Sequence, residues 1–104
     1  MKLYEMERGG TNGFNFVFEK DLEPREEVIV KMPSVSANKR GINDIGWASD
    51  GYISLYGTIE KDARKAVLWQ EIEEHHEINK VTTAIKIVNN DGKKCKVVIR
   101  AIFN

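Results

Sequence analysis

The sequence predicts an all-β protein: a single antiparallel β-sandwich, immunoglobulin-like or jelly-roll-like, with seven to eight short strands. Apolar and polar side chains alternate over several short runs, which is the pattern of strands with one buried face. Turn signals that contain glycine or proline separate these runs at regular spacing. A length of 104 residues fits one domain over residues 1–104, in which two packed sheets bury the apolar rows.

The clearest strands lie in the last quarter of the chain, where we predict a hairpin over residues 81–103 with its turn at Asp91-Gly92. An Asp-Gly pair supplies the positive φ that hairpin turns require. Before the turn, one face carries Val81, Thr83, Ile85 and Ile87. After it, the inner row is Cys95, Val97, Ile99, Ala101 and Phe103, and the outer row carries Lys94, Lys96 and Arg100 with Val98 and Ile102.

The N-terminal half is expected to contribute three strands. The first covers residues 2–7, and a glycine-rich turn at residues 9–13 follows it. The second has an aromatic core row of Phe14, Phe16 and Phe18, and residues 20–27 form a charged connection. The third runs from Val28 to Met32 and ends at Pro33, which cannot donate to a sheet ladder.

Two further features occupy the middle of the chain. Residues 45–48 and 52–58 flank Ser49-Asp50-Gly51 and are predicted to form a second hairpin. Residues 66–74 fit two patterns, because Leu68, Trp69 and Ile72 have helical spacing while the same segment also alternates as a strand does. The strand-rich context favours a short strand over residues 67–72.

Composition excludes several classes of function. Sixteen basic residues balance sixteen acidic ones, so the chain as a whole has no electrostatic attraction to nucleic acid or to an anionic membrane. The single cysteine, Cys95, excludes an internal disulfide and a thiolate metal cluster, and its place in an apolar row favours a packing role. We expect a soluble, cytoplasmic protein, because we find neither a signal peptide nor an apolar run of about 20 residues.

The sequence contains one stretch that resembles a metal-ligand cluster, residues 73–77, with the adjacent His75 and His76. Adjacent side chains point to opposite faces of a strand, so one metal ion would rarely bind both histidines. We therefore favour a solvated acidic loop over a surface site for a divalent ion. Neither a nucleophile elbow nor a phosphate-binding loop is present, and we expect no catalytic residue, no cofactor and no metal.

The charges themselves form two groups. An acidic block consists of Glu71, Glu73, Glu74 and Glu77, and the outer row of the last strand holds Lys94, Lys96 and Arg100. Complementary patches orient proteins on one another, so we expect docking on copies of this chain or on other proteins. Lysines on an outer face also guard sheets against aggregation. The basic row lacks an aromatic for base stacking, so we expect no direct contact with nucleic acid.

Four aromatic residues suggest an alternative function, because exposed rings can stack on sugars. They are Trp47, Tyr52, Tyr56 and Trp69. We favour a packing role, with tryptophans in the core and half-buried tyrosines whose hydroxyl groups are solvated. A carbohydrate-binding module is the alternative to an assembly protein.

The C-terminal half resembles small β-sandwich proteins that are encoded among bacteriophage structural genes. The similarity lies in Tyr56-Gly57-Thr58, in residues 68–72, in Asn79-Lys80 and in residues 83–87. Such proteins decorate capsids or join the neck, tail or baseplate without catalysis. The resemblance implies a structural component of a virion that makes protein contacts, and it transfers no catalytic residue.

Overall fold

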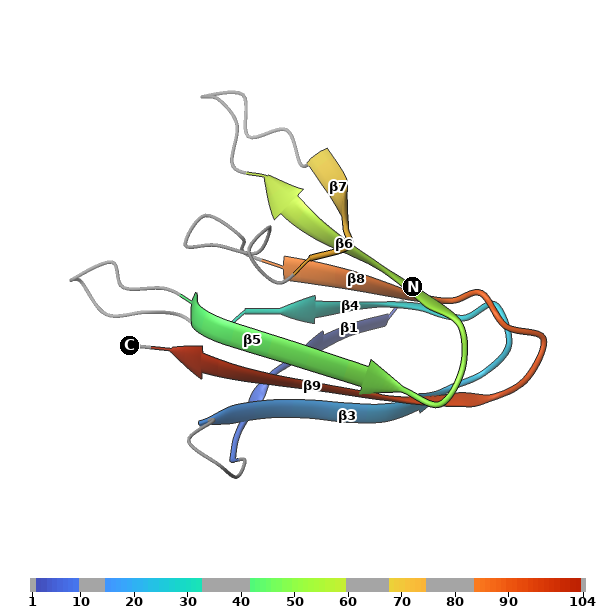
Figure 1. Ribbon diagram of the computed structural model, residues 1–104, viewed down its shortest axis with the longest axis horizontal. Helices are drawn as coiled ribbons and strands as arrows, with labels where there is room; N and C mark the ends of the chain where they lie inside the picture. Colours follow the sequence, from blue (N-terminus) through green and yellow to red (C-terminus); the bar gives the residue numbers. More distant parts are fainter. Residues whose placement is uncertain (1, 10–14, 33–41, 60–67, 75–83, 104) are drawn as a thin grey trace.

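The computed structural model describes residues 2–9, 15–32, 42–59, 68–74 and 84–103. Within these ranges the chain forms nine strands arranged as two packed sheets (Figure 1). The predicted β-sandwich is therefore confirmed. The strand count exceeds the prediction by one or two.

One sheet has five strands and the other has four. The five-stranded sheet has the order β1 (Lys2–Glu5), β4 (Glu27–Lys31), β8 (Ala84–Asn89), β6 (Ile53–Ile59) and β7 (Leu68–Ile72). The four-stranded sheet has the order β2 (Glu7–Arg8), β3 (Phe16–Leu22), β9 (Cys95–Phe103) and β5 (Ile42–Ser49). All neighbours are antiparallel except β1 and β4, which are parallel.

The N-terminal strand changes sheet, which corrects the prediction of one strand over residues 2–7. Residues 2–5 pair with β4 in the five-stranded sheet, and residues 7–8 pair with β3 in the other sheet. Met6 lies at the crossing, where its side chain enters the core and its N–H donates to the carbonyl of Lys31 at 3.4 Å. The alternation of polar and apolar residues continues through the bend, so the sequence did not reveal it.

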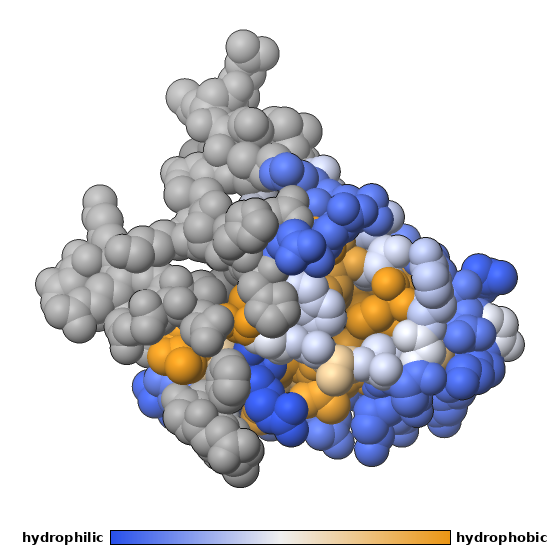
Figure 2. All heavy atoms as spheres, viewed as in Figure 1, coloured by the Kyte–Doolittle hydropathy of each residue, from blue (hydrophilic) through white to orange (hydrophobic). Residues whose placement is uncertain are grey.

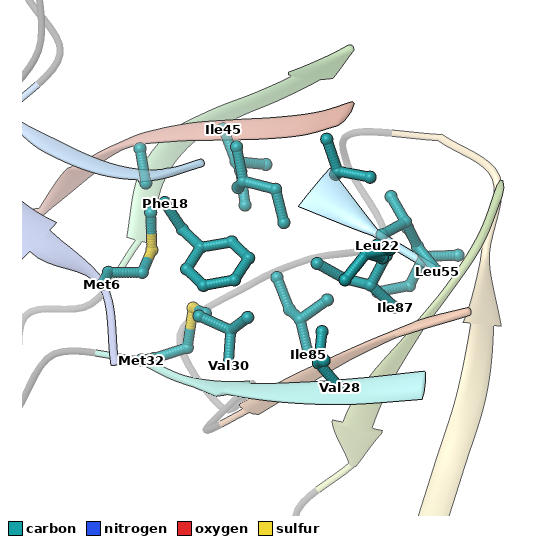
Figure 3. Close-up of a cluster of buried hydrophobic side chains, with 14 residues drawn as sticks. Met6, Phe18, Leu22, Val28, Val30, Met32, Ile45, Leu55, Ile85 and Ile87 are labelled. Carbon is teal, nitrogen blue, oxygen red and sulfur yellow. The ribbon is translucent and has the colours of Figure 1, made fainter. Parts of the chain in front are cut away.

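The core lies between the sheets and is built from the predicted alternating rows (Figure 3). Its fully buried members include Val28, Val30, Ile85, Ile87, Val97, Ile99 and Ala101. Cys95 is also buried in the inner row, as expected of a packing residue. Burying each larger aliphatic side chain contributes about 1.5–3 kcal/mol. Phe14, Val81 and Thr83 lie outside the described residues.

The pattern of buried residues decides two predictions about individual strands. The strand expected over residues 67–72 is present over Leu68–Ile72 as β7, where Ile72 faces the core and Glu71 faces solvent, and residue 67 lies outside the described residues. The strand of the aromatic row is longer than expected, because β3 continues to Leu22 and shortens the predicted connection. Leu22 extends the inner row begun by Phe16 and Phe18 and is fully buried.

Both predicted hairpins are wrong, because their strands belong to different sheets. β8 pairs with β4 and β6, whereas β9 pairs with β3 and β5. Likewise β5 and β6 lie in opposite sheets. The connections after β5 and β8 cross the roughly 10 Å between packed sheets. Among the described residues a positive φ occurs at Arg25 (66°) and Gly9 (144°), so Asp91-Gly92 is not the predicted hairpin turn.

The buried side chain of Asn89 explains the course of the last connection. Its Nδ2 atom donates to the carbonyl oxygens of Leu22 and Glu23, both at 3.1 Å, and of Lys93 at 2.9 Å. Its Oδ1 atom accepts the N–H of Asp91 at 2.8 Å. Three surrounding carbonyl groups require the amide nitrogen on their side, which fixes the orientation of the amide. The Asn89 clamp therefore joins the end of β3 to the connection after β8.

Further polar contacts hold the connection after β5 in the same cluster. Asp50 accepts the N–H of Lys96 on its Oδ1 at 2.8 Å, and Asp91 accepts the N–H of Tyr52 on its Oδ2 at 3.1 Å. The Arg25 guanidinium donates to the carbonyl of Asn90 at 2.8 Å. Arg25 has a positive φ in the turn after Pro24, at a position that usually favours glycine. Its long-range bond helps to hold that turn.

The connection after β5 also requires a glycine. A Cβ atom on Gly51 would lie 1.9 Å from the Sγ of Cys95 and 3.2 Å from its Cβ. No side chain fits at such a distance, so this connection and the start of β9 must shift apart if residue 51 carries one.

We predict that Asn89→Ala lowers the free energy of unfolding by about 3 kcal/mol, because it removes the side-chain hydrogen bonds to Leu22, Glu23, Asp91 and Lys93 together. Urea denaturation monitored by tryptophan fluorescence measures the change. Asn90→Ala is the matched control: its half-buried amide bonds to the hydroxyl of Ser54, and we expect a loss of about 1 kcal/mol or less. Equal losses in the two variants would contradict the role of the clamp.

We predict that Gly51→Ala lowers the free energy of unfolding by about 2 kcal/mol or more, because of the close approach of Cys95. Cys95→Ala removes the sulfur atom that the new Cβ meets. The double variant should therefore be more stable than the sum of the two single losses implies, as a thermodynamic cycle would show. Simple additivity would argue against this contact.

The Asp91 carboxylate adds a pH dependence to stability. The N–H of Tyr52, assisted by those of Gly92 and Lys93, holds the pKa of this carboxyl below its usual range. A carboxyl with a depressed folded-state pKa stabilises the fold above its unfolded-state pKa, and this stabilisation disappears as pH falls through the folded-state pKa. Stability curves of the wild type and Asp91→Asn should therefore converge between about pH 5 and pH 2. A constant difference across this range would contradict the assignment.

Candidate functional site

The structure places the predicted docking residues on two different sheets. Glu71 lies on the outer face of β7, at an edge of the five-stranded sheet, and the exposed Glu73 and Glu74 follow it. Lys96 and Arg100 lie on the outer face of β9 in the four-stranded sheet, and Lys94 immediately precedes that strand. Glu77 lies outside the described residues.

Acidic residues at the neighbouring strand offset part of the basic row. Lys94 pairs with Glu23 at 3.5 Å, and Lys96 pairs with Glu19 at 3.6 Å. Such exposed pairs contribute about 0–1 kcal/mol each to stability, but they reduce the positive potential of this face. Since β3 is far from β9 in the sequence, only the sheet order reveals this pairing.

A cluster of two aromatic residues and a lysine lies on the outer face of the five-stranded sheet. The Nζ atom of Lys86 lies 5.0 Å from the ring centroid of Tyr56 and 5.1 Å from that of Trp69. Cation–π contacts of this kind favour a fixed lysine side chain. Of the other predicted aromatics, Trp47 packs against the core and Tyr52 is 70% exposed in the connection after β5.

An apolar row continues from this cluster across the same face. Register places Tyr56 beside Lys86, Lys86 beside Ile29, and Ile29 beside Leu3 at the sheet edge. Leu3 is 67% exposed, and Ile29 is partly exposed. We call the side chains of Leu3, Ile29, Tyr56, Trp69 and Val88 the outer apolar face. The sequence does not reveal this face, because its residues come from five separate strands.

Apolar side chains also reach solvent elsewhere. Figure 2 shows them among hydrophilic groups on the side of the molecule where β5 and β6 lie toward the viewer.

A hollow lies where the N-terminal strand crosses between the sheets. Its volume is about 370 Å³, and its lining residues are Tyr4, Glu5, Glu7, Val17, Phe18, Glu19 and Lys20. The rings of Tyr4 and Phe18 lie 5.7 Å apart, and the ammonium of Lys20 lies 5.2 Å from the Tyr4 centroid. The sequence held a signal of this opening, because Lys20 follows Phe16 and Phe18 in a row that otherwise faces the core.

The described part of the chain lacks two features that would indicate a particular function. In that part of the chain, no three His, Cys, Asp or Glu side chains are grouped so that they could hold a metal ion. His75 and His76 lie outside it, so the divalent-ion alternative stays a prediction. The same part contains no helix long and apolar enough to cross a membrane.

Comparisons with known proteins yield no relative. No family model matches the chain, and neither the curated proteins nor the solved structures include a match.

Proposed function

We propose that this β-sandwich is a non-catalytic assembly protein that contacts other protein subunits through its outer apolar face. The resemblance to bacteriophage structural proteins makes a virion component, in the capsid decoration, neck, tail or baseplate, the particular form of this proposal. The outer apolar face is the observation that carries it.

The composition of that face favours a protein contact. In sandwiches the outward rows are usually polar, because they face solvent. Here Leu3, Ile29 and Tyr56 lie in one register row, with Val88 and Trp69 in the adjoining rows. Removing apolar surface from water contributes about 25 cal/mol per Å². A partner that covers this face would therefore gain a substantial driving force.

The charges on the same face suit a protein partner. Lys86 and Lys31 alternate with Glu5, Glu27 and Glu71 on the outward positions of this sheet. Mixed signs around an apolar centre provide orientation, as in the polar rims of protein interfaces. The formal net charge of zero also leaves little long-range repulsion between subunits.

We predict that a double variant, Leu3→Glu with Ile29→Glu, reduces self-association or incorporation into particles at least about tenfold, because it adds charge to the apolar centre. Light scattering after size exclusion measures self-association, and co-purification measures incorporation. Ala48→Glu, at an exposed position on the outer face of the four-stranded sheet, is the control. A wild type that stays monomeric at high concentration and joins no particle would refute the proposal.

Carbohydrate binding is the second candidate, favoured by the exposure of Tyr52 and the proximity of Tyr56 to Trp69. Rings of this kind can stack on sugars, although the ammonium of Lys86 lies near the rings of both Tyr56 and Trp69. A glycan array distinguishes the two functions. Binding that is lost in Tyr52→Ala or Tyr56→Ala supports a glycan module, and an array without binding removes this candidate.

A further inference from the structure

The edge of the four-stranded sheet is only partly covered by the N-terminal strand. β3 pairs with β9 along its whole length, from Phe16 to Leu22. On its other side, β2 covers only Phe16 and Val17. The chain reaches β2 from the opposite sheet, because residues 2–5 pair with β4. Within the described part of the chain, β3 therefore has an open edge beyond Val17, along the lower border of the sandwich in Figure 1.

The backbone groups on this edge can be assigned from the ladder. The N–H of Lys96 donates to the Asp50 carboxylate at 2.8 Å and its carbonyl accepts the N–H of Asp50 at 3.3 Å, so both backbone groups of Lys96 point away from β3. The next residue, Val97, points toward β3, where it pairs with Lys20. Residues of an antiparallel strand alternate between their two neighbours. The N–H and C=O groups of Glu19 and Asp21 therefore point out of the open edge, while those of Phe18 and Lys20 serve β9.

The hollow lies beside this edge. Tyr4 and Glu5 of β1 line one side of it, and residues 17–20 of β3 line the other. An extended segment that paired with Glu19 and Asp21 would direct alternate side chains inward, beside Phe18 and Tyr4. A volume of about 370 Å³ accommodates an apolar side chain there.

The charges beside the hollow indicate which other side chains such a segment would carry. Glu5, Glu7 and Glu19 line the hollow, and Asp21 continues the outward row of β3. Two basic side chains oppose these four acidic ones: Lys20 lies over the Tyr4 ring, and Lys96 pairs with Glu19 at 3.6 Å. Opposite charges across neighbouring strands stabilise pairing, and like charges oppose it. The acidic edge therefore disfavours an acidic strand and selects a basic one.

We infer that the open edge of β3 binds an extended segment of a partner protein, with alternating basic and apolar side chains, by adding it as a strand to the four-stranded sheet. The segment continues the line of β2, its basic side chains lie opposite Glu19 and Asp21, and an apolar side chain enters the hollow. Strand addition at a sheet edge combines backbone hydrogen bonds for affinity with side-chain contacts for specificity. This binding mode extends the assembly role but depends on the edge of β3 and the adjoining hollow, not on the outer apolar face.

The test uses a capped peptide of about eight residues, with lysine and valine alternating, as the probe. Amide hydrogen exchange by NMR reports on each N–H separately. In the free protein the amides of Glu19 and Asp21 should exchange faster than those of Phe18 and Lys20, which bond to β9. Saturating peptide should slow Glu19 and Asp21 at least about tenfold. Unchanged exchange at these two amides, or equal binding of a glutamate–valine peptide, would overturn the inference.

Variants of β3 distinguish the contribution of backbone hydrogen bonds to peptide binding from that of the charged side chains. Asp21→Pro removes an edge N–H that β9 does not use and should weaken binding at least about tenfold. If that variant does not fold, Glu19→Lys with Asp21→Lys gives the same expected loss through repulsion. Glu73→Lys with Glu74→Lys carries the same charge change at another edge and should bind normally. Peptide binding that is unaffected by all β3 variants would place the contact elsewhere and refute the inference.

Two outcomes distinguish this inference from the proposed function. If slowing of the Glu19 and Asp21 amides increases with protein concentration in the absence of peptide, a second copy occupies the edge and the basic-partner inference is wrong. If the β3 variants join particles normally while the Leu3→Glu, Ile29→Glu variant does not, the assembly role stands and the strand-addition site fails.

Discussion

The fold depends on a buried amide at one end of the sandwich. Asn89 connects the end of β3 to the connection between β8 and β9, because its buried amide bonds to backbone groups of both segments. The amide nitrogen of Asn89 must face three carbonyl groups, and its amide oxygen must face an N–H. Together these requirements permit one arrangement of the segments. The two sheets are thereby fixed to each other by a polar contact, in addition to the apolar core.

This constraint has consequences for the surrounding connections. Gly51 lies against Cys95 with no room for a side chain, and Asp50 and Asp91 accept backbone N–H groups from neighbouring segments. Because these contacts place both sheet crossings close together, β9 starts beside β3 and β5 instead of beside β8. The paired acidic and basic residues on the outer face of the four-stranded sheet follow from the same sheet order.

The two surfaces proposed for partner binding result from the same strand order that defines the fold. The N-terminal strand crosses sheets at Met6, so it serves both β4 and the beginning of β3 and leaves the rest of β3 uncovered in the described chain. That crossing creates the hollow beside Tyr4 and brings charged residues of three strands together. On the other sheet, register alone brings Leu3 and Tyr56 into one apolar row. Both surfaces proposed for partner binding are thus products of topology.

The sequence alone specifies which side is buried in the strands whose residues alternate clearly. The two-residue alternation around Ile85, Ile87, Val97 and Ile99 specified the all-β class, the core and the packing role of Cys95, because the period of a strand is a local property. It did not determine which strands are neighbours, since an alternating strand has the same pattern beside any partner. The two supposed hairpins failed for that reason. The three-dimensional structure was needed to reveal the sheet crossings, the pairing of basic with acidic residues, and the edge of β3 that is open among the described residues. Each of these depends on contacts between segments distant in sequence.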